Sequence, residues 1–181
     1  MEDVNLVIVA TLNSAGTPVA NGGPSAEDVR SSLFRILEDN VLCSMATVTS
    51  DYQAHVNLAY FSYSEDLELY FISHPESRHC QNLETNPSMA MTVFSSSRTW
   101  GDRDQGLQLF GSCNLARDAN AIKALNSYVI RFPTYTGWQR SLGQDDPGKN
   151  YRLYRFLIDR VKIFDEQVWG EPLSVLATVS R

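Results

Sequence analysis

The chain has 181 residues, of which 43% are hydrophobic, and this length and composition are those of one globular domain. Its 15 basic and 21 acidic residues give a formal net charge of −6, which repels polyanions, so we expect no nucleic-acid partner. No apolar run reaches the roughly 20 residues that cross a bilayer, and the acidic opening does not resemble a secretory signal. Cys43, Cys80 and Cys113 are widely spaced and form no C-x-x-C pair, which is typical of a reducing compartment. We therefore expect a cytoplasmic protein without a membrane segment.

Residues 1–24 are expected to form an arm or extra strand appended to a domain of residues 25–181. Residues 5–12 are apolar and β-branched, and a segment rich in Gly, Pro, Asn and Ser follows them. Such a strand needs a partner for its backbone groups, and strand exchange with a second copy is one possibility. Next, Ser25 as N-cap, with Asp28 three residues later and apolar residues at helical spacing, predicts a helix over residues 26–39.

The rest of the chain is mainly β-rich. Five runs predict strands: residues 41–49, 54–63, 67–73, 88–95 and 107–116. The first three are separated by hairpin-sized breaks and should form an antiparallel meander. A second helix is expected over residues 118–131, a loop over 132–150, and one or two closing strands over 151–165. About six strands joined mostly by hairpins, with peripheral helices, predict a mainly β, α+β fold built as a small closed or split β-barrel.

One segment, H-P-E-S-R-H-C-Q-N-L-E-T-N-P at residues 74–87, combines several chemically active side chains. It predicts a short helix that is capped by Ser77 and ends before Pro87. The backbone N–H groups of the first turn then have no partner, and the helix dipole adds positive charge, which suits a phosphate group. Arg78 offers two parallel donors to such a group, and Ser77 and His79 offer more. The alternative is an ordinary capped helix on the surface.

Other kinds of site receive less support from the sequence. His55, His74, His79 and Cys80 match no common zinc spacing, so we expect no metal site. Cys80 would gain nucleophilicity at a helix start, but beside Leu83 it is more typical of buried packing. The G-x-S-x-G, G-x-G-x-x-G and P-loop motifs are missing, which disfavours serine hydrolases and P-loop NTPases. Among the aromatic residues, those on strands are expected in the core or an interface. Trp100, on a loop, is freer to cover a planar ligand.

The order of the strands, the segment S-R-H-x-Q-N-L-E-x-N-P and the later L-Q-L-F-G-S-C resemble the pyridoxamine 5'-phosphate oxidase-like, FMN-binding split-barrel superfamily. The resemblance covers residues 41–116, and YRFLIDRVKIFD resembles the closing strand. It implies a six-stranded antiparallel split β-barrel. Within the superfamily, the chain more closely resembles small, poorly characterised members with a T/S-R-H-x-Q segment and an R-F-P motif, here Arg131, Phe132 and Pro133. True oxidases carry a C-terminal R-L-H-D-R signature, where this chain has YRLYRFLIDR, so vitamin B6 oxidation is not implied.

The same resemblance implies a set of cofactor-binding residues at the interface of a two-fold homodimer. Ser77, Arg78 and His79 would hold the FMN phosphate. The backbone of four further residues would border the isoalloxazine: Leu58, Ala59, Ile72 and Ser73. Asn57 stands where the oxidases carry an arginine, and His79 stands where a lysine is usual. The partner chain would contribute Gln105 or, as the alternative, Gln108.

The function implied is that of an FMN-dependent oxidoreductase acting on an unidentified small molecule. The flavin performs the electron transfer, so no side-chain acid or base is strictly required, and no catalytic residue is assigned. Two other cofactors stay open, because related split barrels bind haem or a deazaflavin, and His55, His74 or His79 could offer an imidazole to iron. A non-enzymatic protein that senses or stores a flavin is the third alternative.

Overall fold

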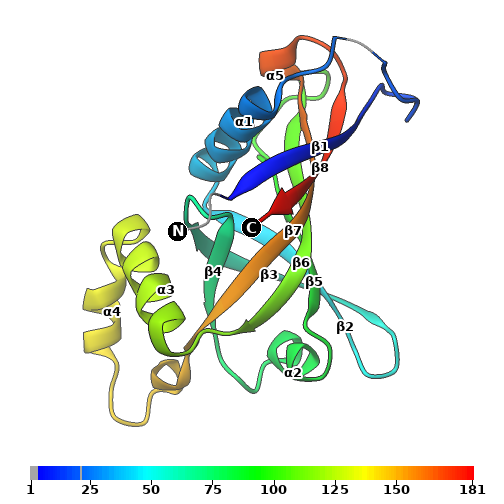
Figure 1. The fold of residues 1–181 in the computed structure, drawn as a ribbon. Helices are drawn as coiled ribbons and strands as arrows, with labels where there is room; N and C mark the ends of the chain where they lie inside the picture. The colour runs from blue at the N-terminus through cyan, green and yellow to red at the C-terminus, as the bar shows by residue number, and fades with distance from the viewer. Residues whose placement is uncertain (1–3, 21) are drawn as a thin grey trace.

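The computed structural model describes residues 4–20 and 22–181, whose strands form one antiparallel sheet with helices at its margins (Figure 1). Residues 1–3 and 21, part of the predicted arm, lie outside the described residues. The strands are β1 Asn5–Leu12, β2 Leu42–Val48, β3 Ala54–Tyr63, β4 Glu68–Ser73, β5 Ser88–Val93, β6 Gln105–Leu115, β7 Arg152–Asp165 and β8 Ser174–Ser180. The helices are α1 Ala26–Asp39, α2 Arg78–Thr85, α3 Asp118–Arg131, α4 Tyr135–Ser141, the 3₁₀ helix η1 Pro147–Asn150, and α5 Glu166–Trp169.

Six of the strands close into a barrel. The sheet runs in the order β1-β8-β7-β4-β3-β2-β5-β6, and β6 also pairs with β7, which joins the last six strands into a ring. The predicted six-stranded antiparallel barrel of mainly β, α+β class is therefore confirmed. Among residues 4–20 and 22–181, no helix is long and apolar enough to span a bilayer.

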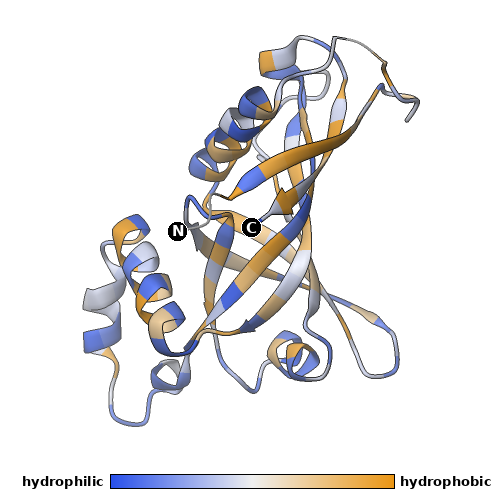
Figure 2. Cartoon of the chain, in the orientation of Figure 1, coloured by the Kyte–Doolittle hydropathy of each residue, from blue (hydrophilic) through white to orange (hydrophobic). Residues whose placement is uncertain are grey.

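Strands β1 and β8 extend the barrel as a two-stranded flap. β1 pairs antiparallel with β8 of the same chain, from Asn5 opposite Ser180 to Leu12 opposite Ser174. The hydropathy colouring shows β1 as one of the most apolar strands (Figure 2), of which Leu6 is buried while Val7 and Val9 are more than half exposed. The C-terminal strand of the same chain therefore supplies the pairing that residues 5–12 require.

Helix α1 has the predicted bounds and closes one end of the barrel. Its capping box is reciprocal: the Ser25 hydroxyl accepts from the Asp28 N–H at 3.2 Å, and the Asp28 carboxylate accepts from the Ser25 N–H at 2.9 Å. At the other end, the Arg131 guanidinium donates to the carbonyls of Leu37 and Asn40, both at 2.6 Å. The arginine of the R-F-P motif thus ties the end of α3 to the end of α1.

Strand β7 changes its inward phase at a bulge. Before the bulge, Tyr154, Phe156 and Ile158 are buried; after it, Val161 and Ile163 are buried. The register with β6 slips between Phe110 and Gly111, where a Cβ on Gly111 would lie 2.0 Å from the Leu157 carbonyl oxygen. The extra residue lets the first half of β7 pair with β4 and the second half with β8, while both halves keep an apolar face inward.

The C-terminal third holds the main differences from the sequence-based expectation. Residues 132–150, expected as a loop, contain α4 and η1. Both are short and are stabilised by ring contacts, such as Tyr135 with Tyr128 and with Trp138, that hydrophobic periodicity does not reveal. Residues 151–165 form one strand and not two, and the final strand β8 was not predicted.

Helix α3 is held to the barrel by a buried acid. Lys123 on α3 and Arg155 on β7 both lie within ion-pair distance of the Glu68 carboxylate, and the Tyr70 hydroxyl also donates to it. Burial by itself would raise the pKa of Glu68, but the bonds from Arg155, Tyr70 and Lys123 outweigh it and lower the pKa to about 2. The carboxylate therefore stays charged at the base of α3.

Because the folded pKa of Glu68 is depressed from the ordinary 4.5 to about 2, its contribution to stability is present above pH 4.5 and is lost as the pH falls toward 2. We expect Glu68→Gln to lower the free energy of unfolding at pH 7, and this deficit to shrink between pH 5 and pH 3, as measured by urea denaturation. Glu65→Gln, a change at an exposed side chain nearby, is the control. A deficit of equal size at pH 7 and pH 3 would contradict the assignment.

Candidate functional site

The barrel wall is open between β3 and β4. These strands pair over only three residue pairs, from Phe61 opposite Phe71 to Tyr63 opposite Leu69. Below them, residues 54–60 of β3 pair with β2, and Ile72 and Ser73 of β4 pair with β7, but the two strands do not pair with each other. Along a strand, backbone groups point alternately to either side, so alternate N–H and C=O groups of both strands face this gap. We call this gap, bordered by residues 54–60 and 72–73, the seam.

The start of α2 lies at the lower end of the seam. Ser77 is the N-cap residue, with φ −66° and ψ 148°, and the first helical bond runs from the Gln81 N–H to the Ser77 carbonyl at 3.0 Å. The amides of Arg78, His79 and Cys80 precede that bond and have no intrahelical acceptor. The predicted cap by the Ser77 side chain is wrong, because its hydroxyl makes no cap bond. The helix start therefore presents its amides without a side-chain oxygen in front of them.

The Ser77 hydroxyl is instead part of a small polar cluster with Ser73 and His79. His79 Nε2 lies 2.7 Å from the Ser73 hydroxyl and 3.2 Å from that of Ser77, and the two hydroxyls are 3.2 Å apart. The His79 ring stacks on His55, with centroids 6.4 Å apart and planes at 10°. This cluster links the end of β4, the start of α2 and the start of β3, so it fixes the lower end of the seam.

His79 is a neutral member of this cluster. It is 6% exposed, and burial, followed by the nearby His55, lowers its pKa below the ordinary 6.5. The imidazole therefore orients the two hydroxyls and does not add a full positive charge at the helix start. A lysine at this position would behave differently.

Arg78 is the free cation at this end of the seam. Its side chain is exposed and makes no hydrogen bond or ion pair within the part of the chain that the structure describes. Its charge does reach Asp51, whose pKa is lowered first by a bond from Thr49 and only slightly by Arg78. The guanidinium is therefore available for an anion at the α2 start.

The remaining seam residues are placed as follows. Leu58 lies on the outer face of β3, and its carbonyl accepts from Asn57 Nδ2 at 3.0 Å. Asn57 and Ala59 are on the opposite, inward-facing side of β3, and Ile72 and Ser73 end β4. The structure thus brings Asn57, Leu58, Ala59, Ile72 and Ser73 to the borders of the seam, near Ser77, Arg78 and His79. Sequence reasoning missed the Ser73 hydroxyl and the stacking of His55, because both depend on where β4 ends in space.

The inner face of α2 has a packing role. Cys80 is fully buried, as its position beside Leu83 suggested, and so it is not an accessible nucleophile. Asn82 Nδ2 donates to the Thr47 hydroxyl of β2 at 2.9 Å, which anchors the helix under the barrel. Within residues 4–20 and 22–181, no group of three or more His, Cys, Asp or Glu side chains could hold a metal ion.

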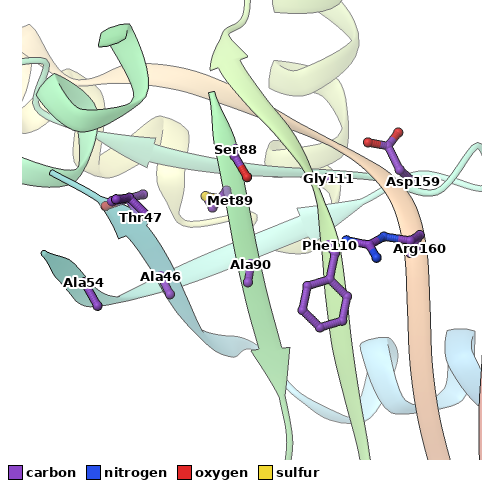
Figure 3. Close-up of a pocket in the computed structure, with 11 residues that line it drawn as sticks. Ala46, Thr47, Ala54, Ser88, Met89, Ala90, Phe110, Gly111, Asp159 and Arg160 are labelled. Atoms are coloured by element: carbon purple, nitrogen blue, oxygen red, sulfur yellow. The ribbon is translucent and has the colours of Figure 1, made fainter. Parts of the chain in front are cut away.

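The outer face of the barrel beside the seam is apolar. Val56, Leu58 and Tyr60 on β3 are 63%, 69% and 55% exposed, and Leu42 lies opposite Tyr60 on β2. Where this face crosses β2 and β5, its side chains are small, and they line an open groove of about 320 Å³ (Figure 3). Ala46, Ala54 and Ala90 line it, with the Phe110 ring and the Arg160 guanidinium at its edge. Alternation of apolar residues on β3 was the sequence signal for this face.

Three further predicted residues lie away from the α2 start. Gln105 is 3% exposed and its Oε1 accepts from Arg35 at 3.1 Å, so its side chain is already engaged. Gln108 lies on the outer face of β6, opposite Thr92, on the same side as the apolar residues of β3. Trp100 is 93% exposed on the β5–β6 loop. Of the two glutamines, Gln108 is the one whose side chain lies on the outer face of the barrel.

A closed six-stranded antiparallel barrel, opened at one seam that ends on a short helix, defines the class of split β-barrels. The chain belongs to the pyridoxamine 5'-phosphate oxidase family, because the sequence profile of that family matches residues 29–165. No curated protein matches the chain.

Solved structures show the same fold at low sequence identity. A haem-binding protein from Mycobacterium smegmatis has a TM-score of 0.61 at 12% identity, covering 80% of this chain and 55% of its own. A conserved hypothetical protein from Mycobacterium tuberculosis has a TM-score of 0.62 at 14% identity, covering 85% and 92%. HutZ, a haem storage protein from Vibrio cholerae, has a TM-score of 0.57 at 15% identity, covering 71% and 89%.

The lowered pKa of His79 predicts that more than half of the protein has a neutral His79 ring at pH 6.5. In a titration of the ring carbon resonances by NMR, His79 should reach its midpoint below pH 6.5, and His55→Gln should move that midpoint upward by removing the neighbouring charge. A midpoint at or above pH 6.5 in the unchanged protein would show that His79 is not held as described.

Proposed function

We propose that the protein is a homodimeric, FMN-dependent oxidoreductase that acts on a small molecule. The observation that carries the proposal is the open helix start of α2 at the end of an unpaired seam. A phosphate ester fits the helix start, since three backbone amides and two hydroxyls lie there without a competing side-chain cap, and the first helical residue, Arg78, has an exposed side chain. A flat heterocycle with donors and acceptors on its edge fits the unpaired seam.

The residues of the chain have separate roles in this proposal. Ser77, Arg78 and the first-turn amides would bind the phosphate, and His79 would hold the Ser73 and Ser77 hydroxyls in place. The backbone of Leu58 and Ile72 would orient the ring system along the seam. FMN, when bound, supplies a reversible hydride acceptor, so the protein contributes binding, orientation and electrostatics.

The proposed dimer is supported by the apolar outer face. An exposed surface that carries Val56, Leu58 and Tyr60 side by side with Leu42 is unusual for a protein that remains monomeric. A second copy laid on this face would bury it and would bring a Gln108 toward the seam of the first. A dimer formed through this surface would place the flavin between the two chains.

A haem-binding role is the second candidate. Two of the similar structures are named as haem proteins, and His55 and His74 lie beside the seam. His79 is less suited to iron, because its Nε2 is engaged by Ser73 and Ser77. A deazaflavin in the same seam, or a flavin that is bound without turnover, would differ from the main proposal only in chemistry.

Mass spectrometry of the small molecule that copurifies with the native protein, together with its absorption spectrum, tests the cofactor. We expect FMN and flavin absorption bands, with turnover when a reduced nicotinamide and an acceptor are supplied. A Soret band on haem addition, lost on replacing His55 or His74, would support the haem alternative. Tight FMN binding without turnover would support the sensing or storage role.

Arg78→Ala should weaken FMN binding by about 1.5–3 kcal/mol, because it removes a charge-assisted bond to the phosphate. Isothermal titration calorimetry of the protein stripped of cofactor measures this. Arg117→Ala, which removes another exposed arginine, should leave the dissociation constant unchanged. An Arg78→Ala protein that binds FMN as tightly as the unchanged protein would reduce the segment to a surface helix.

Leu58→Asp should convert the dimer to a monomer, because it places a charge in the centre of the apolar outer face. Sedimentation velocity across a range of protein concentrations gives the oligomeric state. Ile130→Asp, at another strongly exposed hydrophobic side chain, is the matched control and should remain dimeric. If the unchanged protein sediments as a monomer at every concentration, the proposed interface is absent.

A further inference from the structure

Aromatic residues from α3 to the start of β7, together with Tyr60 of β3, form a continuous series of ring contacts, which we call the aromatic arc. Neighbouring rings in the series have centroids 4.8–6.0 Å apart. In order of contact, the members of the arc are Tyr60, Phe132, Tyr128, Tyr135, Trp138 and Tyr151.

Both ends of the arc meet the seam. Tyr60 lies on β3 directly below the last residues that pair with β4. At the other end, Tyr151 contacts His74, edge to face at 6.1 Å, and His74 follows Ser73 at the end of β4. Between these ends, α3 and α4 stand beside β4, and the chain returns below them to β7 (Figure 1). The arc therefore borders the seam along its length.

Two members of the arc outside the proposed dimer face keep much of their surface in solvent. Tyr151 is 40% exposed and Trp138 is 38% exposed, whereas Tyr60, 55% exposed in the single chain, would be covered by the second copy. The rest of the arc supports them from behind, with Tyr128 only 4% exposed. Rings that are fixed by their neighbours and open on one side can bind another planar ring with little loss of side-chain freedom.

Two cations, Arg152 and Lys149, lie in the segment that ends the arc, which also contains the acids Asp145 and Asp146. The Arg152 guanidinium donates to the carbonyls of Lys149 at 3.1 Å and Tyr151 at 2.9 Å, which holds it beside the backbone of Tyr151. Neither Arg152 nor Lys149 forms an ion pair within the described ranges, 4–20 and 22–181. The nearby Asp146 carboxylate accepts from the Gly148 amide and caps η1. In a chain of net charge −6, two unpaired cations beside open rings are suited to an organic anion.

We propose that the arc binds a planar aromatic carboxylate, with its ring against Trp138 and Tyr151 and its carboxylate at Arg152 and Lys149. As a statement about the substrate class of the oxidoreductase, this rests on the proposed function. As a statement about binding, it rests only on the arc and its two cations.

The full-length protein, as purified and again with saturating FMN, is titrated by calorimetry with three probes. These are 2-naphthoate, cyclohexanecarboxylate, which has the charge without the planar aromatic ring, and 2-naphthylmethanol, which has the ring without the charge. We expect 2-naphthoate to bind at least five-fold more tightly than either of the others. Trp138→Leu and Arg152→Gln should each weaken 2-naphthoate binding at least five-fold.

Phe94→Leu and Arg117→Gln are the matched controls, because they remove an exposed aromatic ring and an exposed arginine outside the arc, and they should leave binding unchanged. Circular dichroism checks the fold of each variant. If Trp138→Leu does not fold, the exposed Arg152→Gln decides alone. Equal binding of all three probes, or 2-naphthoate binding that Arg152→Gln leaves unchanged, overturns the proposal.

The two proposals fail separately. If FMN binds and depends on Arg78 while 2-naphthoate does not bind, the arc proposal fails and the flavin proposal stands. If 2-naphthoate binds and depends on Trp138 or Arg152 while FMN does not bind, the arc is a site for an aromatic carboxylate without the flavin.

Discussion

The early end of pairing between β3 and β4 is the constraint on which the rest of the site depends. Three residue pairs hold these strands together, after which β4 stays with β7 and β3 stays with β2. A strand that is paired on both sides has no backbone groups left for a ligand. Where two neighbouring strands diverge, the edge of each that faces the other stays free. The stacked rings of His55 and His79, and the hydroxyls bonded to His79, occupy the widened end and keep the strands apart there.

Two polar arrangements, one around Glu68 and one around Arg131, fix helix α3 beside the seam. Glu68 gathers Lys123 from α3 and Arg155 from β7, so the first half of α3 is fixed to the strand that borders the seam. Arg131 fixes the last turn of α3 to the end of α1 and lies over the rings of Phe61 and Tyr63. With both ends of α3 held by charge, the aromatic residues that follow it are carried at a defined distance from β3 and β4. The position of the aromatic arc therefore depends on the ion pairs of Glu68 at one end of α3 and on the contacts of Arg131 at the other.

Much of the fold could be predicted from local sequence, because local signals were strong where they existed. Ser25 with Asp28 marked the start of α1, and alternation marked β3 over the same residues that the structure shows. Helix α4 and strand β8 escaped prediction, because α4 is stabilised by contacts with the rings of Tyr128 and Tyr151 outside the helix and β8 by β1 at the opposite end of the chain. The S-R-H segment predicted where helix α2 starts. The turned hydroxyl of Ser77 could not be foreseen, because it depends on Ser73 and His79 meeting in space, and the seam leaves no trace in the pattern of β3.

The number of residues at the bulge of strand β7 decides which of its side chains point into the core. Asp159 and Arg160 are both exposed at the bulge, and the two halves of the strand point opposite parities of residue number toward the core. Deleting either one would turn Val161 and Ile163 to solvent and bring Lys162 inside, along the stretch that holds β8 and, through it, β1. The fold therefore depends more on the number of residues at the bulge than on the chemical identity of these two. A shift of one position in β7 would disturb its pairing with β8 and, through β8, the pairing of β1.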